Sequence, residues 1–143
     1  MRQLGMILPG GARKLIAETG RDDRGWSSHL ADLWPEPIAG IRNVHLVELK
    51  PGAVRGNHVH REMNEGIVIL SGPCRVVLEA AGERHEESCA ADHPVLFLMP
   101  PGVAHAFHNL SDKPIHLVCL ADREFDATDP DHYRYELISG TKV

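Results

Sequence analysis

From Ile41 onward the chain alternates short apolar segments with clusters of Gly, Pro, Asn and Asp. Short apolar segments bounded by turn residues are typical of the strands of a sandwich or barrel. We expect strands at residues 44–49, 66–71, 74–79, 84–88, 95–99, 104–109 and 115–120. The segments 66–71 and 74–79 form a predicted hairpin about Gly72-Pro73, and the segment 84–88 follows a predicted turn at Ala81-Gly82.

The first 40 residues lack this pattern. They hold both tryptophans, Trp26 and Trp34, and a polar turn at residues 19–25, while residues 29–33 are too few to decide on a helix. A chain of 143 residues fits one domain with a single core. We therefore expect an irregular N-terminal extension (1–40), a barrel (41–125) and a C-terminal tail (126–143).

Charge and composition exclude several classes of partner. The 15 Lys and Arg against 20 Asp and Glu give a net charge of -5, and no basic run is present, so nucleic acid is not expected. The apolar run from Leu4 to Leu8 is too short for an export signal, and no segment approaches the ~20 apolar residues of a membrane span. These observations predict a cytoplasmic protein with neither a nucleic acid nor a membrane as partner.

The three cysteines are odd in number and far apart in the sequence. Cys74, Cys89 and Cys119 form no Cys-x-x-Cys pair, so neither a disulfide framework nor a thiolate zinc site is indicated. We expect buried and unreactive thiols.

Two histidines one residue apart form the first part of a candidate metal site. On a strand, the side chains of His58 and His60 lie on the same face. Glu65 would face the opposite way on a straight strand, so we expect a turn at residues 61–64 to bring it back on the neighbouring antiparallel strand. His105, just after a Pro-Gly turn, supplies a third imidazole.

Three imidazoles and one carboxylate are a usual ligand set for a divalent transition metal. The donors do not name the ion: zinc is our first expectation, with iron, manganese, nickel, cobalt and copper as alternatives. The remaining histidines have no such spacing, and we interpret them as ordinary surface or core residues. They include His29, His45, His85, His93, His116 and His132, while His108 is expected to face out of the barrel.

These residues carry a family resemblance. Every place of the first sequence motif of the cupin superfamily is filled, by Gly52, His58, His60, Glu65 and Gly72. Four places of the second motif are filled, by Pro100, Gly102, His105 and Asn109. The one departure is Pro94, where the family usually has glycine. The resemblance implies an all-β, single-domain cupin: an antiparallel double-stranded β-helix, or jelly-roll barrel, with the metal inside it.

A narrower resemblance concerns the substrate. Residues 55–60, Arg-Gly-Asn-His-Val-His, are similar to a segment shared by capsular polysaccharide epimerase domains and keto-sugar isomerases, and residues 23–25 resemble part of the isomerases. The tail at residues 125–133 looks like the ending of the capsular group. Because the isomerases generally lack the acidic ligand that Glu65 provides here, the resemblance is closer to the cupin domain of the capsular epimerase/reductase enzymes. The resemblance implies an epimerase or isomerase of a nucleotide-linked keto-deoxysugar in polysaccharide biosynthesis.

That kinship suggests roles for two further residues. Arg55 would contact the sugar or its diphosphate, the plain alternative being a surface ion pair, and Tyr133 is a candidate general acid from its place in the tail. No general base stands out.

Two other functions stay open. One is a metal-dependent dioxygenase whose cavity is lined by Phe97, Phe107, Met63 and Met99, and the other is a module that binds a small molecule without turnover. In each case we expect a small-molecule ligand and a homodimer, because unpaired strand edges invite a second chain.

Overall fold

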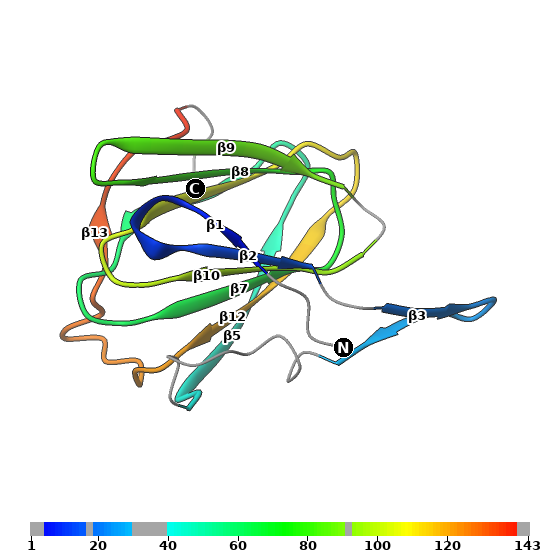
Figure 1. Ribbon diagram of the computed structural model, residues 1–143, viewed down its shortest axis with the longest axis horizontal. Coiled ribbons are helices and arrows are strands. Elements are labelled where there is room, and N and C mark those ends of the chain that lie inside the picture. Colours follow the sequence, from blue (N-terminus) through cyan, green and yellow to red (C-terminus); the bar gives the residue numbers. More distant parts are fainter. Residues whose placement is uncertain (1–4, 17–18, 30–39, 91–92, 140–143) are drawn as a thin grey trace.

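Two antiparallel sheets make up most of the protein (Figure 1). The computed structural model describes residues 5–16, 19–29, 40–90 and 93–139. The six-stranded sheet has the order β1 (Met6–Ile7), β2 (Arg13–Ile16), β10 (Val95–Met99), β7 (Glu65–Ile69), β12 (Ile115–Ala121) and β5 (Asn43–Leu49). The five-stranded sheet has the order β13 (Tyr133–Arg134), β6 (Val54–Val59), β11 (Ala104–Asn109), β8 (Cys74–Ala80) and β9 (Glu83–Cys89).

This architecture confirms the expected all-β jelly roll. Each of the seven predicted segments forms a strand, with ends within two residues of those expected. The described residues contain one short 3-10 helix, η1 (Pro9–Gly11), and no helix with the length and apolarity that crossing a membrane requires.

The predicted hairpin between residues 66–71 and 74–79 is wrong. β7 pairs with β10 and β12, whereas β8 pairs with β9 and β11, so the chain passes from one sheet to the other at residues 70–73. The five residues of β7 are all buried, and a strand buried on both faces has no alternation that would identify its partner. The predicted turn at Ala81-Gly82 does join a hairpin, formed by β8 and β9.

The described part of the N-terminal region is more regular than expected. β1 and β2 extend the six-stranded sheet beyond β10, and Leu15 is buried there. The expected polar turn at residues 19–25 is a hairpin of β3 (Thr19–Asp22) and β4 (Gly25–Ser28), which projects from the two sheets (Figure 1). Of the undecided helical segment 29–33, residues 30–33 lie outside the described residues.

The main core lies between the two sheets. Its largest side chains are Phe97 and Phe107, both fully buried. The predicted burial of Cys74, Cys89 and Cys119 is confirmed, and burial raises the pKa of these thiols to about 12, 11 and 12, respectively.

The C-terminal tail covers the outer face of the five-stranded sheet. Leu137 and Ile138 are buried against Val77 and its neighbours on β11. The Asn57 side chain accepts the backbone N–H groups of both tail residues and donates to the Ile138 carbonyl oxygen. The tail is thereby held next to β6, the strand that carries the predicted metal ligands.

Candidate metal centre

A bulge in β6 places Arg55 and His58 at the same cavity. His105 of β11 pairs with His58, but Ala106 pairs with Gly56, so one residue of β6 is left over. Gly56 and Asn57 both have positive φ, at 97° and 55°. Gly56 also passes close to β11, because a Cβ there would lie 2.6 Å from the His105 carbonyl oxygen. Only glycine fits both demands.

The structure brings the four predicted ligands together. His58, His60, Glu65 and His105 each offer a ligand atom, and these atoms all lie within 4.8 Å of one another. His60, Glu65 and His105 are buried, whereas His58 is half-buried at the cavity. The expectation for Glu65 needs correction, because it enters from β7 of the six-stranded sheet and not from a strand adjacent to β6. The donors therefore converge from both sheets.

Main-chain oxygens orient two of the imidazoles. Nδ1 of His60 lies 2.7 Å from the Asp131 carbonyl oxygen, and Nδ1 of His105 lies 3.0 Å from that of Val103. A carbonyl oxygen only accepts, so both Nδ1 atoms carry a proton, and in the neutral imidazole Nε2 is then the atom free to bind a metal. These Nε2 atoms face Glu65 Oε1 at 3.4 Å and 3.2 Å.

The His105 Nε2 atom shows that a metal fits this donor set. The atom is buried and has no hydrogen-bond partner, since its approach to Glu65 lacks hydrogen-bond geometry. A buried lone pair without a partner is costly unless it has a ligand to bind. A divalent ion among the four side chains would satisfy it.

The protonation of the cluster also suits a cation. Burial, followed by the neighbouring imidazoles of His105 and His60, lowers the pKa of His58 to about 3, so this donor is neutral above that pH. Burial opposes ionisation of Glu65, but when His105 and His60 are protonated their hydrogen bonds and positive charge outweigh it and hold the pKa of Glu65 well below its usual range. Against the effect of burial, Glu65 in turn raises the pKa of His60. Glu65 supplies the negative charge of the centre.

The cavity beside these ligands is small and largely apolar. It has a volume of about 140 Å³. Its wall includes Ile67, Phe107 and Leu117 in addition to His58 and Glu65. Arg55 also lines it, donating Nε to the Glu48 carbonyl oxygen at 3.3 Å. Within the described residues Arg55 makes no ion pair, so its charge is available to a ligand.

A second cavity of about 350 Å³ adjoins the first. The two share His45, Glu65 and His132, and the second adds apolar side chains such as Met63 and Phe125. Arg123 also lines it, but its guanidinium already pairs with Asp129, Glu62 and Asp131.

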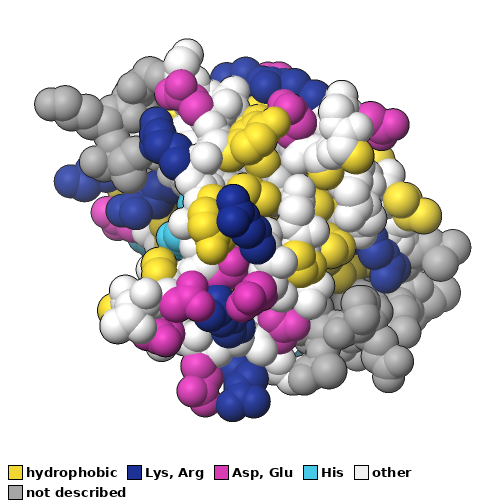
Figure 2. Space-filling view, turned by 90° about the vertical axis from the view of Figure 1, so that its left-hand side faces the viewer, with side chains coloured by type: hydrophobic (Ala, Val, Ile, Leu, Met, Phe, Trp, Pro, Cys, Tyr) yellow, Lys and Arg dark blue, Asp and Glu magenta, His cyan; other side chains and the backbone are white. Residues whose placement is uncertain are grey.

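On the face seen in Figure 2, acidic side chains gather in the lower part with basic ones among them.

The tail places a different residue at the cavity from the one predicted. The Tyr133 ring lies under the Arg61 guanidinium, 3.8 Å from ring centroid to Cζ, and lines neither cavity. Its neighbour His132 lines both cavities and stacks on His58. The expectation that His132 is an ordinary surface or core histidine is therefore wrong, and its position beside Tyr133 in the tail resemblance is the sequence signal for its role.

The jelly roll, the two filled motifs and the convergence of His58, His60, Glu65 and His105 define a cupin. Residues 22–133 match the model of the polysaccharide biosynthesis C-terminal domain, and the chain belongs to that family.

Relatives and solved structures extend this result. The chain is 25% identical over 120 residues to the spore coat polysaccharide biosynthesis protein SpsL of Bacillus subtilis, covering 79% of this chain and 80% of SpsL. It is 31% identical over 94 residues to TDP-4-oxo-6-deoxy-alpha-D-glucose-3,4-oxoisomerase of Aneurinibacillus thermoaerophilus, covering 65% of this chain and 66% of that enzyme.

The capsular polysaccharide assembling protein CapF of Staphylococcus aureus has a similar fold, with a TM-score of 0.63 and 26% identity. The match covers 85% of this chain but only 33% of CapF, so the chain spans about a third of that protein.

Proposed function

We propose that this protein is a metal-binding epimerase or isomerase that acts on a nucleotide-linked keto-deoxysugar in polysaccharide biosynthesis. The observation that carries the proposal is the convergence of His58, His60, Glu65 and His105 beside a cavity that Arg55 also lines. The isomerase relative supports the substrate class, since its name specifies a TDP-linked oxo-deoxysugar.

His58, His60, Glu65 and His105 would hold the metal. Three neutral donors and one carboxylate leave a divalent ion with net positive charge, so when bound it supplies a Lewis acid for a ketone or enolate oxygen. Zinc remains our first expectation for the ion.

The chain's own residues would bind the substrate and move its proton. The apolar wall of Ile67, Phe107 and Leu117 excludes water, which strengthens electrostatic contacts inside the cavity. Arg55 is placed to contact the sugar or its diphosphate. A base must lie within reach of the carbon next to the ketone, and outside the ligand set the imidazoles in this wall are His45 and His132. Tyr133 as a general acid remains a prediction.

The sizes of the two cavities suit a substrate with two parts. A volume of about 140 Å³ takes a group the size of one sugar ring and not a whole nucleotide sugar. The adjoining cavity of about 350 Å³, with the exposed Phe125, offers an aromatic surface on which a nucleobase can stack.

The test combines binding and exchange. Calorimetry with TDP- and UDP-linked 4-keto-6-deoxysugars should show binding, and NMR in deuterium oxide should show deuterium entering the carbon next to the ketone. Arg55→Ala should weaken binding about tenfold or more, as expected for a charge-assisted contact. The control Arg134→Ala alters an exposed arginine that pairs with Glu136 and lines neither cavity. Unchanged binding by Arg55→Ala would refute the role of Arg55.

The alternatives have distinct marks. A dioxygenase would consume oxygen and contain a redox-active metal. Of the four residues predicted to line its cavity, Phe107 lines the cavity beside the four ligands, called here the metal cavity, and Met63 lines the second cavity. A binding module would bind the sugar without deuterium exchange. The homodimer and the cytoplasmic location remain predictions.

A further inference from the structure

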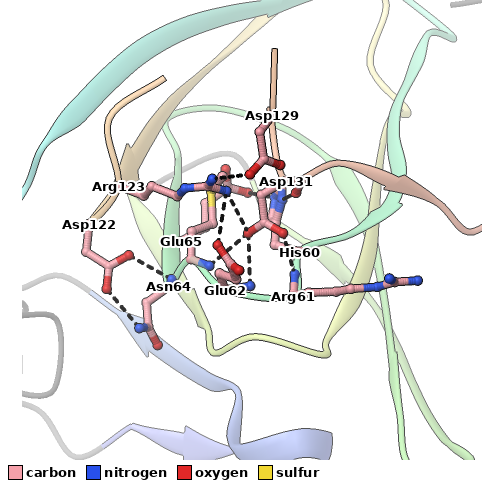
Figure 3. Close-up of polar contacts among 10 residues, drawn as sticks. His60, Arg61, Glu62, Asn64, Glu65, Asp122, Arg123, Asp129 and Asp131 are labelled. Atoms are coloured by element: carbon pink, nitrogen blue, oxygen red, sulfur yellow. Dashed lines mark hydrogen bonds and ion pairs between the residues drawn. The ribbon is translucent and has the colours of Figure 1, made fainter. Parts of the chain in front are cut away.

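The turn that separates two of the proposed ligands is held by carboxylates from outside it. Residues 61–64 connect His60 to Glu65 (Figure 3). Asp131 accepts the backbone N–H groups of Arg61, Glu62 and Met63 at 2.8, 3.0 and 2.9 Å. Asp122 accepts the fourth, that of Asn64, at 2.9 Å. The conformation of the turn therefore depends on two aspartates that follow β12.

Asp131 also contacts one ligand through its main chain. Its carbonyl oxygen accepts the Nδ1 proton of His60 at 2.7 Å. Such a contact fixes the tautomer and the ring orientation of a metal-binding histidine. One residue of the tail thus orients His60 and fixes the path of the chain from His60 to Glu65.

The position of Asp131 is itself strongly determined. The residue is 2% exposed and has a φ of 53°, a conformation that Asp and Asn tolerate better than most residues. Arg123 Nη1 lies 3.7 Å from the carboxylate of Asp131. The same atom lies 3.6 Å from the carboxylate of Glu62, a residue of the turn. The hydrogen bonds from the three backbone N–H groups overcome the effect of burial and lower the pKa of Asp131.

We infer that Asp131 is a positioning residue of the metal centre, through which the docked C-terminal tail sets the affinity and geometry of the site. This inference rests on the proposed metal binding and adds a role that the sequence motifs of the cupins do not contain. It also gives a physical reason for Asp131, one of three aspartates in the tail segment 125–133.

The sharpest variant is Asp131→Asn. Asparagine has nearly the same shape and accepts the positive φ. Its amide nitrogen would replace one carboxylate oxygen and face backbone N–H groups that need an acceptor. At least one of the three hydrogen bonds must break, and the negative charge is lost. The control is Asp129→Asn, which removes a partner of Arg123 at 2.8 Å but no contact to the turn.

The experiment measures zinc affinity by competition with a chelating dye, and the visible absorption spectrum of the cobalt(II) form. Asp131→Asn should bind zinc about 10- to 100-fold more weakly than wild type, with an altered cobalt spectrum. Asp129→Asn should stay within about twofold, with the wild-type spectrum. A purely structural role would lower the melting temperature of the metal-free protein and leave both metal measurements unchanged.

The outcomes separate the inference from the proposed function. Wild-type zinc affinity and cobalt spectrum in a folded Asp131→Asn would overturn the inference alone. No zinc binding by the wild type would overturn metal binding and the inference together. If Asp131→Asn does not fold, Asp122→Asn loosens the same turn at Asn64. Unchanged zinc affinity in that variant would overturn the claim that the conformation of the turn sets the affinity of the site, and with it the route by which Asp131 is inferred to act.

Discussion

The imidazole of His132 stacks on that of His58, with ring centroids 4.4 Å apart and planes inclined by 22°. The stack joins a residue of the tail to His58. Unlike His60 and His105, His58 has no hydrogen bond to a main-chain oxygen within the described residues. An aromatic pair contributes about 0.5–1.5 kcal/mol, which corresponds to about a two- to tenfold change in affinity. We therefore expect His132→Ala to loosen His58 and to weaken zinc binding by about that factor. His132→Phe keeps a ring in the same place and should retain most of the affinity. Equal zinc affinity in the Ala variant and the wild type would show that the stack does not support the site.

Replacement of Asn109, a residue of the second cupin motif, should lower the stability of the fold. Its buried side chain donates to the carbonyl oxygens of Leu49 and Lys113 at 2.9 and 2.7 Å, and accepts the backbone N–H of Ser111. Asn109→Ala leaves these groups without their partner and should lower the free energy of unfolding by about 1–3 kcal/mol. Urea unfolding measures it. Ser111→Ala, which removes one hydroxyl from the same network, should cost less, and a larger effect there would contradict this account.

The Lys14–Glu87 ion pair predicts a dependence of stability on pH. It links β2 of the six-stranded sheet to β9, an edge strand of the five-stranded sheet. His85 lies 2.9 Å from the same carboxylate. Burial opposes ionisation of Glu87, but Lys14, followed by His85, outweighs it and lowers the pKa. A lowered folded-state pKa adds stability that is present above the ordinary value of 4.5 and is lost as the pH falls through the folded-state value.

Unfolding curves measured from pH 7 to pH 3 test this point. Glu87→Gln should be less stable than wild type at pH 7, and the difference should shrink toward pH 3. The control is Glu83→Gln, at an exposed position of the same strand. A difference between Glu87→Gln and wild type that stays constant across the range would assign the effect to packing and not to charge.

The cysteines should be unreactive in the folded state. Cys74, Cys89 and Cys119 are buried and their pKa values are raised, so at pH 8 little thiolate is present or accessible. A thiol-reactive disulfide reagent should label the native protein slowly and all three cysteines in denaturant. Fast labelling of Cys119, which lines the metal cavity, would mean that the cavity admits the reagent.

The strands and the clustering of the four proposed ligands could be predicted from local rules. Strand position follows from short apolar segments between turn residues, and the spacing of His58 and His60 needs only the two-residue period of a strand. These local rules do not identify partners, so the hairpin of 66–71 with 74–79 and the neighbouring-strand origin of Glu65 were wrong. The order of strands in a jelly roll depends on contacts distant in the sequence.

The two-residue period also fails at Arg55. Arg55 lies three positions before His58, an odd separation that would place it on the opposite face, yet the bulge at Gly56 and Asn57 brings both side chains to one cavity. The Gly-Asn pair, which tolerates positive φ, was the available signal. His132 and Asp131 were harder to predict, because they approach the site through tail packing about 70 residues away in sequence.

Metal content tests the central claim most directly. Elemental analysis of the purified protein should find close to one equivalent of a divalent transition metal, with zinc expected first, and a variant with His58→Ala and His60→Ala should have lost it while keeping its β-sheet circular dichroism. Absence of metal from the wild-type protein, together with no uptake of added zinc or cobalt, would contradict the account.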